Sequence, residues 1–273
     1  MDSEMSCCER IKFASSKLVV EFFGTFVLTL VFVTNSSFGI VLAYWILSIF
    51  VWKISSAQFN PAITLAYMFR TDSKKIHPVL GLLMMAAQCF GAYIAALYMF
   101  FMFWKSAIMG PGPAGNAWYC ICQEIIGTFV FVLLYKIVTD ERLHFSKENS
   151  INMFVIAAIY QTSRQIVNGD TDAVSTYGAV LNPAIAVGIT LFSVFNDAGT
   201  TFTYFWIYWF LPLGGSMLAL LFYRFVYVKT QNMVLQDDKH NEEERIEPDD
   251  VDIMKLKDGS TVDISQGIID VDA

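Results

Sequence analysis

Two asparagines, each followed by Pro and Ala, are the first candidates for chemistry in this sequence. The triplet Asn-Pro-Ala occurs twice, as Asn60, Pro61 and Ala62 and again as Asn182, Pro183 and Ala184. Asn is a preferred residue just before a helix, and Pro suits the first helical position because its missing N–H would have no partner there. If each Asn caps its helix through the side-chain oxygen, its NH₂ group remains a hydrogen-bond donor beside the positive end of the helix dipole. Such a pair can bind a neutral polar molecule and repel a cation.

Two glutamates inside apolar segments form a second repeated feature. Glu21 begins the stretch EFFGTFV at 21–27, and Glu124 begins EIIGTFV at 124–130. A carboxylate within a membrane is costly unless it faces the protein interior and finds polar partners there. Both side chains are therefore expected to point inward.

The composition places these residues in a membrane protein. Hydrophobic residues make up 55% and charged residues 16% of the 273 residues, whereas about a quarter of residues are charged in soluble domains. Six apolar segments are candidate membrane spans, although the fifth is of marginal length: 18–33, 38–53, 79–104, 118–138, 151–167 and 202–228. The apolar runs after the two triplets end near Arg70 and Phe195, and each is about half a span long.

Several functional classes have no support in the sequence. The spans exclude a soluble enzyme, and no nucleophile lies beside a base in a recognisable pattern. The five cysteines have no metal-ligand spacing, so neither a metal nor another cofactor is expected. No basic face with interleaved aromatic residues appears, so nucleic-acid binding is not expected either.

The two halves of the chain, about 18–104 and 118–228, repeat one order of features. Each half has a span with a buried Glu, a second span, an Asn-Pro-Ala half-helix and a third span. An odd number of full spans makes the second half inverted relative to the first. The half-helices are therefore expected to enter from opposite faces and to meet near the midplane. Several residues at corresponding places are interpreted as helix-packing positions: Gly24, Gln88, Gly91, Gly127, Pro212 and Gly215.

The distribution of charge predicts the orientation. If segment 1–17 is cytoplasmic, most Lys and Arg lie on the inner side, and only Lys105 and Arg164 lie on the outer side. Both termini are thus predicted to be cytoplasmic, in a plasma membrane or an intracellular vacuolar membrane. More than half of the 25 acidic residues lie in 231–273. The segment 229–273 is therefore expected to be a solvated, disordered tail.

Between residues 18 and 228 the sequence resembles the aquaporin (major intrinsic protein) family. The resemblance rests on GTF after each buried Glu and on SAQFNPAITLA, AAQCFGAYIAA, EIIGTFVFVL, LNPAIAVGI and FWIYWFLPLGG. It implies an all-α membrane fold of six transmembrane helices and two re-entrant half-helices, assembled as a homotetramer. It also implies that Glu21 and Glu124 accept hydrogen bonds from the irregular segment before each half-helix and hold that segment in place.

The resemblance further implies an outer selectivity filter, and there this chain departs from the family. Most members have Arg directly after the second triplet, whereas this position is Ile185 here. The other filter positions correspond to Ile40, with Phe38 as a neighbouring alternative, to Gln161 and to Ala179. An apolar filter could pass water less selectively, admit small neutral solutes, or dewet and close.

Arg164 has two interpretations, because it lies near the outer end of the fifth span. It is either a solvated loop residue, which we favour from the sequence, or it folds back and replaces the missing charge.

The sequence predicts a passive water channel that excludes ions and protons at the Asn pair. Two further positions resemble those of water-type members: Ala186, where glycerol-type members have Asp, and the pair Tyr208 and Trp209 in the sixth span. One alternative is a facilitator of small neutral solutes such as glycerol, urea or ammonia. A second is a poorly conducting junction or scaffold protein that docks partners through its acidic tail.

Overall fold

The computed structural model of the chain is almost entirely helical. It describes residues 6–34, 36–71, 74–103, 111, 116–140, 146–168 and 178–246, so Lys105 and residues 247–273 lie outside the described part. The helices are α1 (Cys7–Val33), α2 (Ser37–Ser55), α3 (Pro61–Met68), α4 (Pro78–Phe103), α5 (Ala117–Val138), α6 (Asn149–Asn168), α7 (Pro183–Phe222), a π-helical turn (Tyr223–Tyr227) and α8 (Val228–Ile246). The chain divides into two units, Met1–Phe225 and Val226–Ala273, which are described separately.

Apolar helices of membrane-spanning length dominate the first unit. Among the described residues, α1, α2, α4, α5 and the stretch Phe202–Asp238 are each apolar and long enough to cross a bilayer. The helix α6 is more polar, because its buried face carries Gln161, Ser163 and Arg164. The predicted class, an all-α membrane protein, is confirmed.

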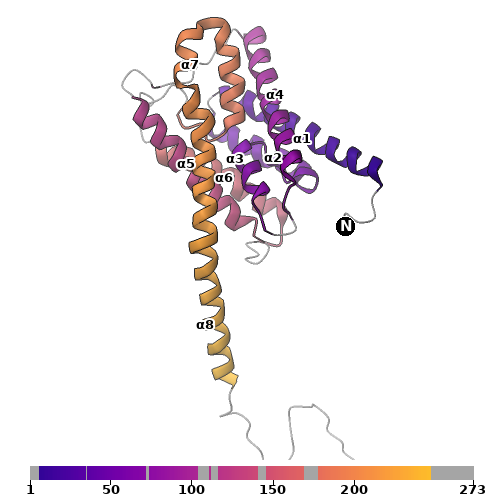
Figure 1. Ribbon diagram of the computed structural model, residues 1–273, viewed down its shortest axis with the longest axis vertical. Helices are drawn as coiled ribbons and strands as arrows, with labels where there is room; N and C mark the ends of the chain where they lie inside the picture. Colours follow the sequence, from indigo (N-terminus) through magenta and orange to yellow (C-terminus); the bar gives the residue numbers. More distant parts are fainter. Residues whose placement is uncertain are drawn as a thin grey trace, which may run out of the picture. The chain divides into compact units, whose positions relative to one another are not determined.

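The two half-helices begin at the predicted asparagines. Asn60 caps α3 by accepting a hydrogen bond from the Ala62 N–H at 2.8 Å. Asn182 caps α7 in the same way, accepting from the Ala184 N–H at 3.0 Å. The second half-helix was expected to end near Phe195, but α7 is assigned as one helix of 40 residues. Figure 1 shows that α7 arches back on itself, so its first part still runs as a separate arm beside its last part.

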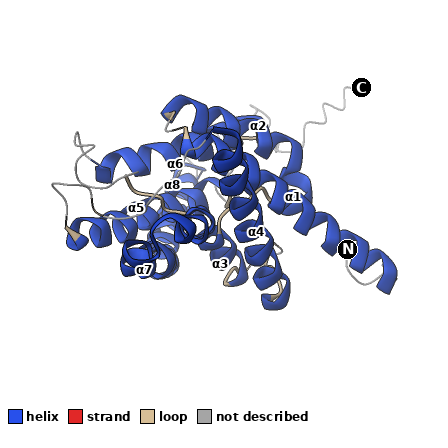
Figure 2. Cartoon of the chain, turned by 90° about the horizontal axis from the view of Figure 1, so that it is seen from above, coloured by secondary structure: helices blue, strands red, loops and turns tan. Residues whose placement is uncertain are grey.

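The two halves of the bundle pack in the same way. In the first half α1 packs against α2 and α4, and in the second half α5 packs against α6 and α7. Viewed from above, α1, α2 and α4 lie on one side of the bundle, and α5, α6 and α7 on the other (Figure 2). A Cβ on Gly91 would lie 2.2 Å from the Phe22 carbonyl oxygen, and one on Gly215 would lie 2.6 Å from that of Ile125. These two glycines therefore allow close helix contacts, as the sequence predicts.

The second unit differs from the expected disordered tail. Val228–Ile246 forms α8, a helix with a polar composition. This stretch contains neither Gly nor Pro and is rich in Gln, Glu and Lys, which favour helix. The structure thus has a helix over 228–246, where the sequence predicts a disordered tail.

Candidate functional site

The two asparagines meet at the centre of the first unit, and each bonds to the opposite half. The side-chain nitrogen of Asn60 donates to the Leu181 carbonyl at 2.8 Å, and that of Asn182 donates to the Phe59 carbonyl at 2.8 Å. Both side chains are buried. Each NH₂ group is thus a donor, as expected, but one of its hydrogens is used to join the two loops. An amide NH₂ carries two hydrogens, so a second donor remains on each Asn.

The backbone before each Asn adopts an unusual conformation that makes this exchange possible. Phe59 has φ of 49° and Leu181 has φ of 54°. The left-handed region costs on the order of 1–3 kcal/mol for such residues and persists where the surroundings over-determine it. Corresponding residues of the two halves thus have the same strained geometry.

Glu21 and Glu124 supply the interactions that hold these strained segments. Glu21 accepts from the N–H groups of Gln58 at 3.0 Å and Phe59 at 2.7 Å. Glu124 accepts from those of Val180 at 2.7 Å and Leu181 at 2.9 Å. The geometry is that of the loop-holding role implied by the resemblance.

Gly24 and Gly127 accommodate side chains of the same segments. A Cβ on Gly24 would lie 2.0 Å from the Phe59 ring, and a Cβ on Gly127 would lie 2.6 Å from the Leu181 side chain. We interpreted both glycines from the sequence as helix-packing positions. Each creates the space into which the residue before the Asn folds, and Gly127 also lies against the Val167 side chain of α6, where a Cβ would be 3.1 Å away.

Gln88 is a polar partner of the site and does not serve only in packing. Its side-chain nitrogen donates to Glu21 at 2.7 Å and to the Thr64 hydroxyl at 2.9 Å, so it joins the carboxylate to α3. Ser55 also donates to Glu21, at 2.5 Å. Sequence reasoning missed both partners, although a Gln inside an apolar span is itself a signal of a polar interaction.

A hydroxyl from the last part of α7 completes the support of α3. Ser216 donates to the Ala62 carbonyl at 2.7 Å, and its side chain is fully buried. The segment before the second half-helix has a similar support, because the Tyr160 hydroxyl on α6 donates to the Val180 carbonyl at 2.8 Å. Sequence reasoning missed these contacts as well, because neither residue belongs to a motif.

The four expected filter residues are all buried: Ile40, Gln161, Ala179 and Ile185. Gln161 donates to the Ser37 hydroxyl at 2.9 Å, which links α6 to the first turn of α2, one turn before Ile40. Ile185 lies in the first turn of α7, directly after the triplet. The structure therefore connects Gln161 to the beginning of α2 but provides no polar group at position 185.

Arg164 is the largest departure from the sequence interpretation. The sequence favours a solvated residue here, but only 3% of the Arg164 surface is exposed. Its Nε donates to the Ala179 carbonyl at 2.7 Å, and a terminal guanidinium nitrogen donates to the Gln161 side-chain oxygen at 3.0 Å. The guanidinium carbon also lies 4.4 Å from the centroid of the Phe32 ring on α1. The side chain thus folds back onto two of the expected filter residues.

Tyr208 and Trp209, the expected sixth-span pair, occupy different environments. Tyr208 is buried, with 2% of its surface exposed. Trp209 is half-buried and stacks on Phe205 with the ring centroids 6.0 Å apart. Only Tyr208 therefore belongs to the core of the bundle.

The opposite end of the bundle has an aromatic and cationic cluster that the sequence did not reveal. The Tyr67 and Tyr135 hydroxyls lie 3.3 Å apart, and the Tyr135 hydroxyl also lies 3.2 Å from the Ser56 carbonyl. Arg70 packs over the Tyr67 ring and donates to the Thr139 hydroxyl at 3.2 Å.

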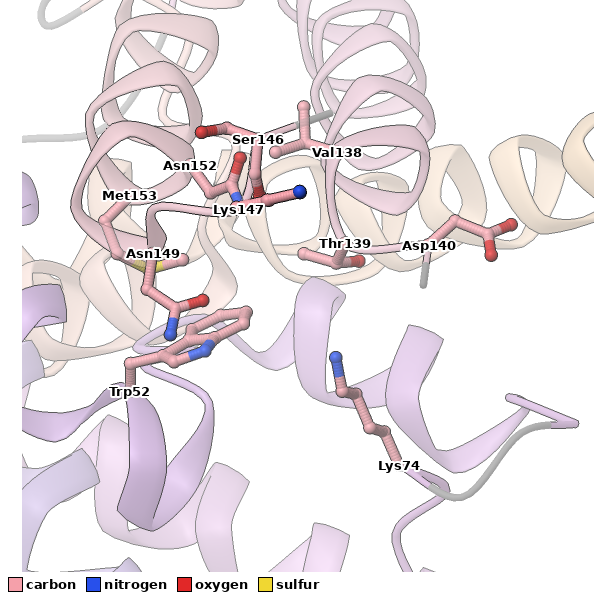
Figure 3. Close-up of a pocket in the computed structure, with 10 residues that line it drawn as sticks. All are labelled: Trp52, Lys74, Val138, Thr139, Asp140, Ser146, Lys147, Asn149, Asn152 and Met153. Carbon is pink, nitrogen blue, oxygen red and sulfur yellow. The ribbon is translucent and has the colours of Figure 1, made fainter. Parts of the chain in front are cut away.

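A cavity of about 380 Å³ opens at this same end, where α2 and α5 end and α6 begins. Its lining includes Trp52, Lys74, Thr139, Asp140 and Lys147. Figure 3 shows Lys74 extending toward the cavity from the side opposite Asn149 and Asn152. The walls are mostly polar, as in an opening that admits water. In the predicted orientation this is the inner end, and the Arg164 end is the outer one.

No group of His, Cys, Asp and Glu side chains with metal-binding geometry occurs among the described residues. The polar groups described above are mostly amides, carboxylates and hydroxyls, together with the guanidiniums of Arg164 and Arg70. This set is suited to binding and orienting a neutral molecule.

Comparison with known proteins matches this chain to one family of proteins. A family profile described as "Major intrinsic protein" matches residues 31–223. "Aquaporin FA-CHIP" of Pelophylax lessonae is 27% identical over 231 residues, which cover 81% of this chain and 78% of that protein. "Aquaporin PIP2-4" of Oryza sativa subsp. japonica is 29% identical over 181 residues, which cover 63% of this chain and 59% of that protein.

Among solved structures, the aquaglyceroporin from Plasmodium falciparum has the same fold. It aligns with a TM-score of 0.67 at 20% sequence identity, over 81% of this chain and 99% of that one.

Proposed function

The chain belongs to the major intrinsic protein family of membrane channels, and we propose that within this family it is a passive water channel. Water would pass in single file between the two half-helices, and ions and protons would be excluded. The observation that carries this proposal is the meeting of Asn60 and Asn182, each bonded at 2.8 Å to the backbone of the opposite half.

The Asn pair provides a physical basis for passing water and stopping cations. Each helix N-terminus carries about half a positive charge, so two of them facing each other raise the energy of a cation between them. The remaining hydrogen of each Asn NH₂ can donate to a passing water molecule. A water that accepts from both amides has its lone pairs toward the protein, so it cannot accept a proton from a neighbouring water. The chain of hydrogen bonds along which protons move is thereby interrupted.

Rigidity of the pair is part of the proposed mechanism. The carboxylates of Glu21 and Glu124 bond the N–H groups that precede each Asn. The reciprocal bonds then fix the separation of the two half-helices. Donors fixed in advance cost no reorganisation as each water arrives.

A second candidate is a facilitator of small neutral solutes, and the apolar character of the expected filter favours it. Ile40, Ala179 and Ile185 offer no polar side-chain atom, so the filter would discriminate by size and by the polar groups of Gln161 and Arg164. The fold neighbour from Plasmodium falciparum is an aquaglyceroporin. Ala186 and Tyr208 resemble water-type members and weigh toward water.

The same proposal includes the location, orientation and oligomeric state of the channel. The first unit exposes many large apolar side chains, among them Leu82, Phe90 and Phe101 on α4, as expected for a lipid-facing surface. We place both termini in the cytoplasm, in a plasma membrane or a vacuolar membrane, and expect a homotetramer.

Stopped-flow permeability of proteoliposomes containing the full chain tests the proposal. We expect osmotic shrinkage to be faster than in empty liposomes and to have a low activation energy. Swelling in glycerol and urea is measured on the same vesicles. Solute entry as fast as water entry would favour the second candidate, and water rates equal to those of empty liposomes would reject both.

A further inference from the structure

We propose that a column of aromatic side chains between the Asn pair and the cavity sets the size of the solute that the channel passes. The aromatic column consists of Tyr44, Tyr67, Phe131, Tyr135 and Tyr160. The inference rests on the proposed function for the existence of a path. It goes further because it assigns the rejection of solutes the size of urea and glycerol to these rings and not to the outer filter.

The aromatic column lies where the two halves of the protein meet, and all five rings are fully buried. The centroid of the Tyr44 ring on α2 lies 5.7 Å from that of Tyr160 on α6. On α5 the Phe131 ring lies 5.1 Å from Tyr160 and 6.1 Å from Tyr135. Tyr135 then meets Tyr67 of α3 at 6.2 Å. The column therefore crosses from one half of the chain to the other twice.

One end of the aromatic column reaches the Asn pair. The Tyr44 hydroxyl donates to the Gln58 carbonyl at 3.3 Å, and the Tyr160 hydroxyl donates to the Val180 carbonyl at 2.8 Å. Gln58 and Val180 each stand two residues before an Asn-Pro-Ala triplet. Two tyrosines thus bond corresponding carbonyls of the two halves, directly beside the asparagines.

The other end of the aromatic column approaches the cavity. Trp52 of α2 and Thr139 of α5 line that cavity (Figure 3). Tyr44 lies about two turns before Trp52, and Tyr135 about one turn before Thr139. Residues four apart on a helix lie on the same face. The helix faces that line the cavity therefore carry the rings one or two turns deeper in the bundle.

Two buried polar atoms beside the column mark a route for a small polar molecule. Within the part of the chain that the structure describes, the Ser48 hydroxyl and the side-chain oxygen of Gln58 have no hydrogen-bond partner. Ser48 lies on the buried face of α2, between Tyr44 and Trp52. Buried polar atoms normally have a partner, and water often provides it. A water molecule that passes the rings can bind at both atoms.

The rings and the hydroxyls of the column have different effects on a solute. The Tyr135 hydroxyl lies 3.2 Å from the Ser56 carbonyl and 3.3 Å from the Tyr67 hydroxyl. A hydroxyl can donate and accept, so it can bond a passing water. The rings are bulky and are held by their neighbours on four helices. Ring size therefore limits the solute, and the hydroxyls provide bonds to water.

Core packing alone is the competing interpretation, because large buried rings also stabilise a bundle. Tyr135 is replaced with Leu, Ala or Phe in the full chain, and each form is reconstituted at equal density after its unfolding midpoint has been recorded. Leu keeps an apolar side chain at the site and is the variant to use if the Ala form does not fold. Tyr98→Ala is the matched control, because Tyr98 on α4 lies outside the column and is 43% exposed.

Water flux is measured by osmotic shrinkage, and solute entry by swelling in urea and in glycerol. We expect Tyr135→Leu and Tyr135→Ala to admit both solutes on the order of tenfold faster than the wild type, because pore diameter sets selectivity. Tyr135→Phe should lower water flux, since water loses a hydrogen-bonding group, but should still reject both solutes. Tyr98→Ala should behave as the wild type does.

Three outcomes would overturn the inference: solute entry unchanged in the folded Tyr135→Leu form, an equal rise in Tyr98→Ala, or glycerol entry into wild-type vesicles as fast as water entry. Failure of the proposed function is a separate result, namely wild-type water flux equal to that of empty liposomes. In that case a gain of water flux in Tyr135→Leu would still identify the column as the constriction, and equal rates would overturn the inference as well.

Discussion

The side-chain nitrogen of Asn182 lies 2.8 Å from the carbonyl oxygen of Phe59, the residue that precedes Asn60 in the chain. The bond crosses from one half of the protein to the other, and Asn60 returns it to Leu181 at the same distance. The two half-helices are therefore connected through the same amides that are proposed to orient water. A change at either Asn should consequently affect both conduction and the relative position of the halves.

Replacing Asn182 with Asp should make the channel leak protons and other cations. Asp keeps an oxygen that can cap α7 at Ala184, but it has no hydrogen for the Phe59 carbonyl or for water. Its negative charge also offsets the positive helix end. We expect cation entry into proteoliposomes to rise on the order of tenfold, since the electrostatic barrier loses about half a charge or more. Cation entry equal to that of the wild type would show that the Asn pair does not form the barrier.

Replacing Glu124 with Gln should destabilise the second half. Gln has one acceptor oxygen, and its NH₂ would face an N–H donor, so one of the Val180 and Leu181 N–H groups would lose its partner. The loss should cost about 1–3 kcal/mol of the free energy of unfolding. The measurement is the midpoint of thermal unfolding in detergent.

Glu9 provides the matched control for this variant. It is exposed and caps α1 together with Ser6, so Glu9→Gln should shift the unfolding midpoint less than Glu124→Gln does. Equal effects of the two substitutions would remove the argument that Glu124 holds the strained segment.

Replacing Gly24 with Ala should disturb the first Asn through Phe59. The added Cβ would lie 2.0 Å from the Phe59 ring, so the ring and the strained backbone next to Asn60 must move. Overpacking of this kind typically costs about 1–3 kcal/mol. We expect both the unfolding midpoint and the water permeability to fall.

Gly214 provides the control for that substitution, because a Cβ there would meet no atom within 4 Å. Gly214→Ala should leave water permeability unchanged and slightly favour the helix. If the Gly24→Ala and Gly214→Ala variants have equal water permeability, a glycine at position 24 is not needed to make space for the Phe59 ring.

The sequence revealed the parts of the site that repeat. Both triplets and both buried glutamates recur at corresponding places, so their pairing could be predicted from order and span count. The all-α membrane fold followed from the apolar segments and was confirmed, although α7 joins the second half-helix to the last span.

Other residues of the site were missed or misread for physical reasons. Gly24 looks like a packing residue because a pattern of small residues does not show whether a helix or a side chain fills the space. Gln88 bonds Glu21 across 67 positions of sequence. Arg164 reaches a carbonyl 15 positions later along the chain. No periodicity records such contacts, because they depend on how far a flexible side chain extends once the backbone has folded.

Water flux through vesicles carrying either the wild type or Asn60→Ala/Asn182→Ala tests the account most directly. Both forms are reconstituted at equal protein density, and osmotic shrinkage is followed by stopped flow over a range of temperatures. We predict that the wild type shrinks faster than empty liposomes with a low activation energy, and that the double variant loses most of this excess rate. Shrinkage of the wild type at the rate of empty liposomes, or equal excess rates for the two forms, would contradict the claim that the paired asparagines form a water path.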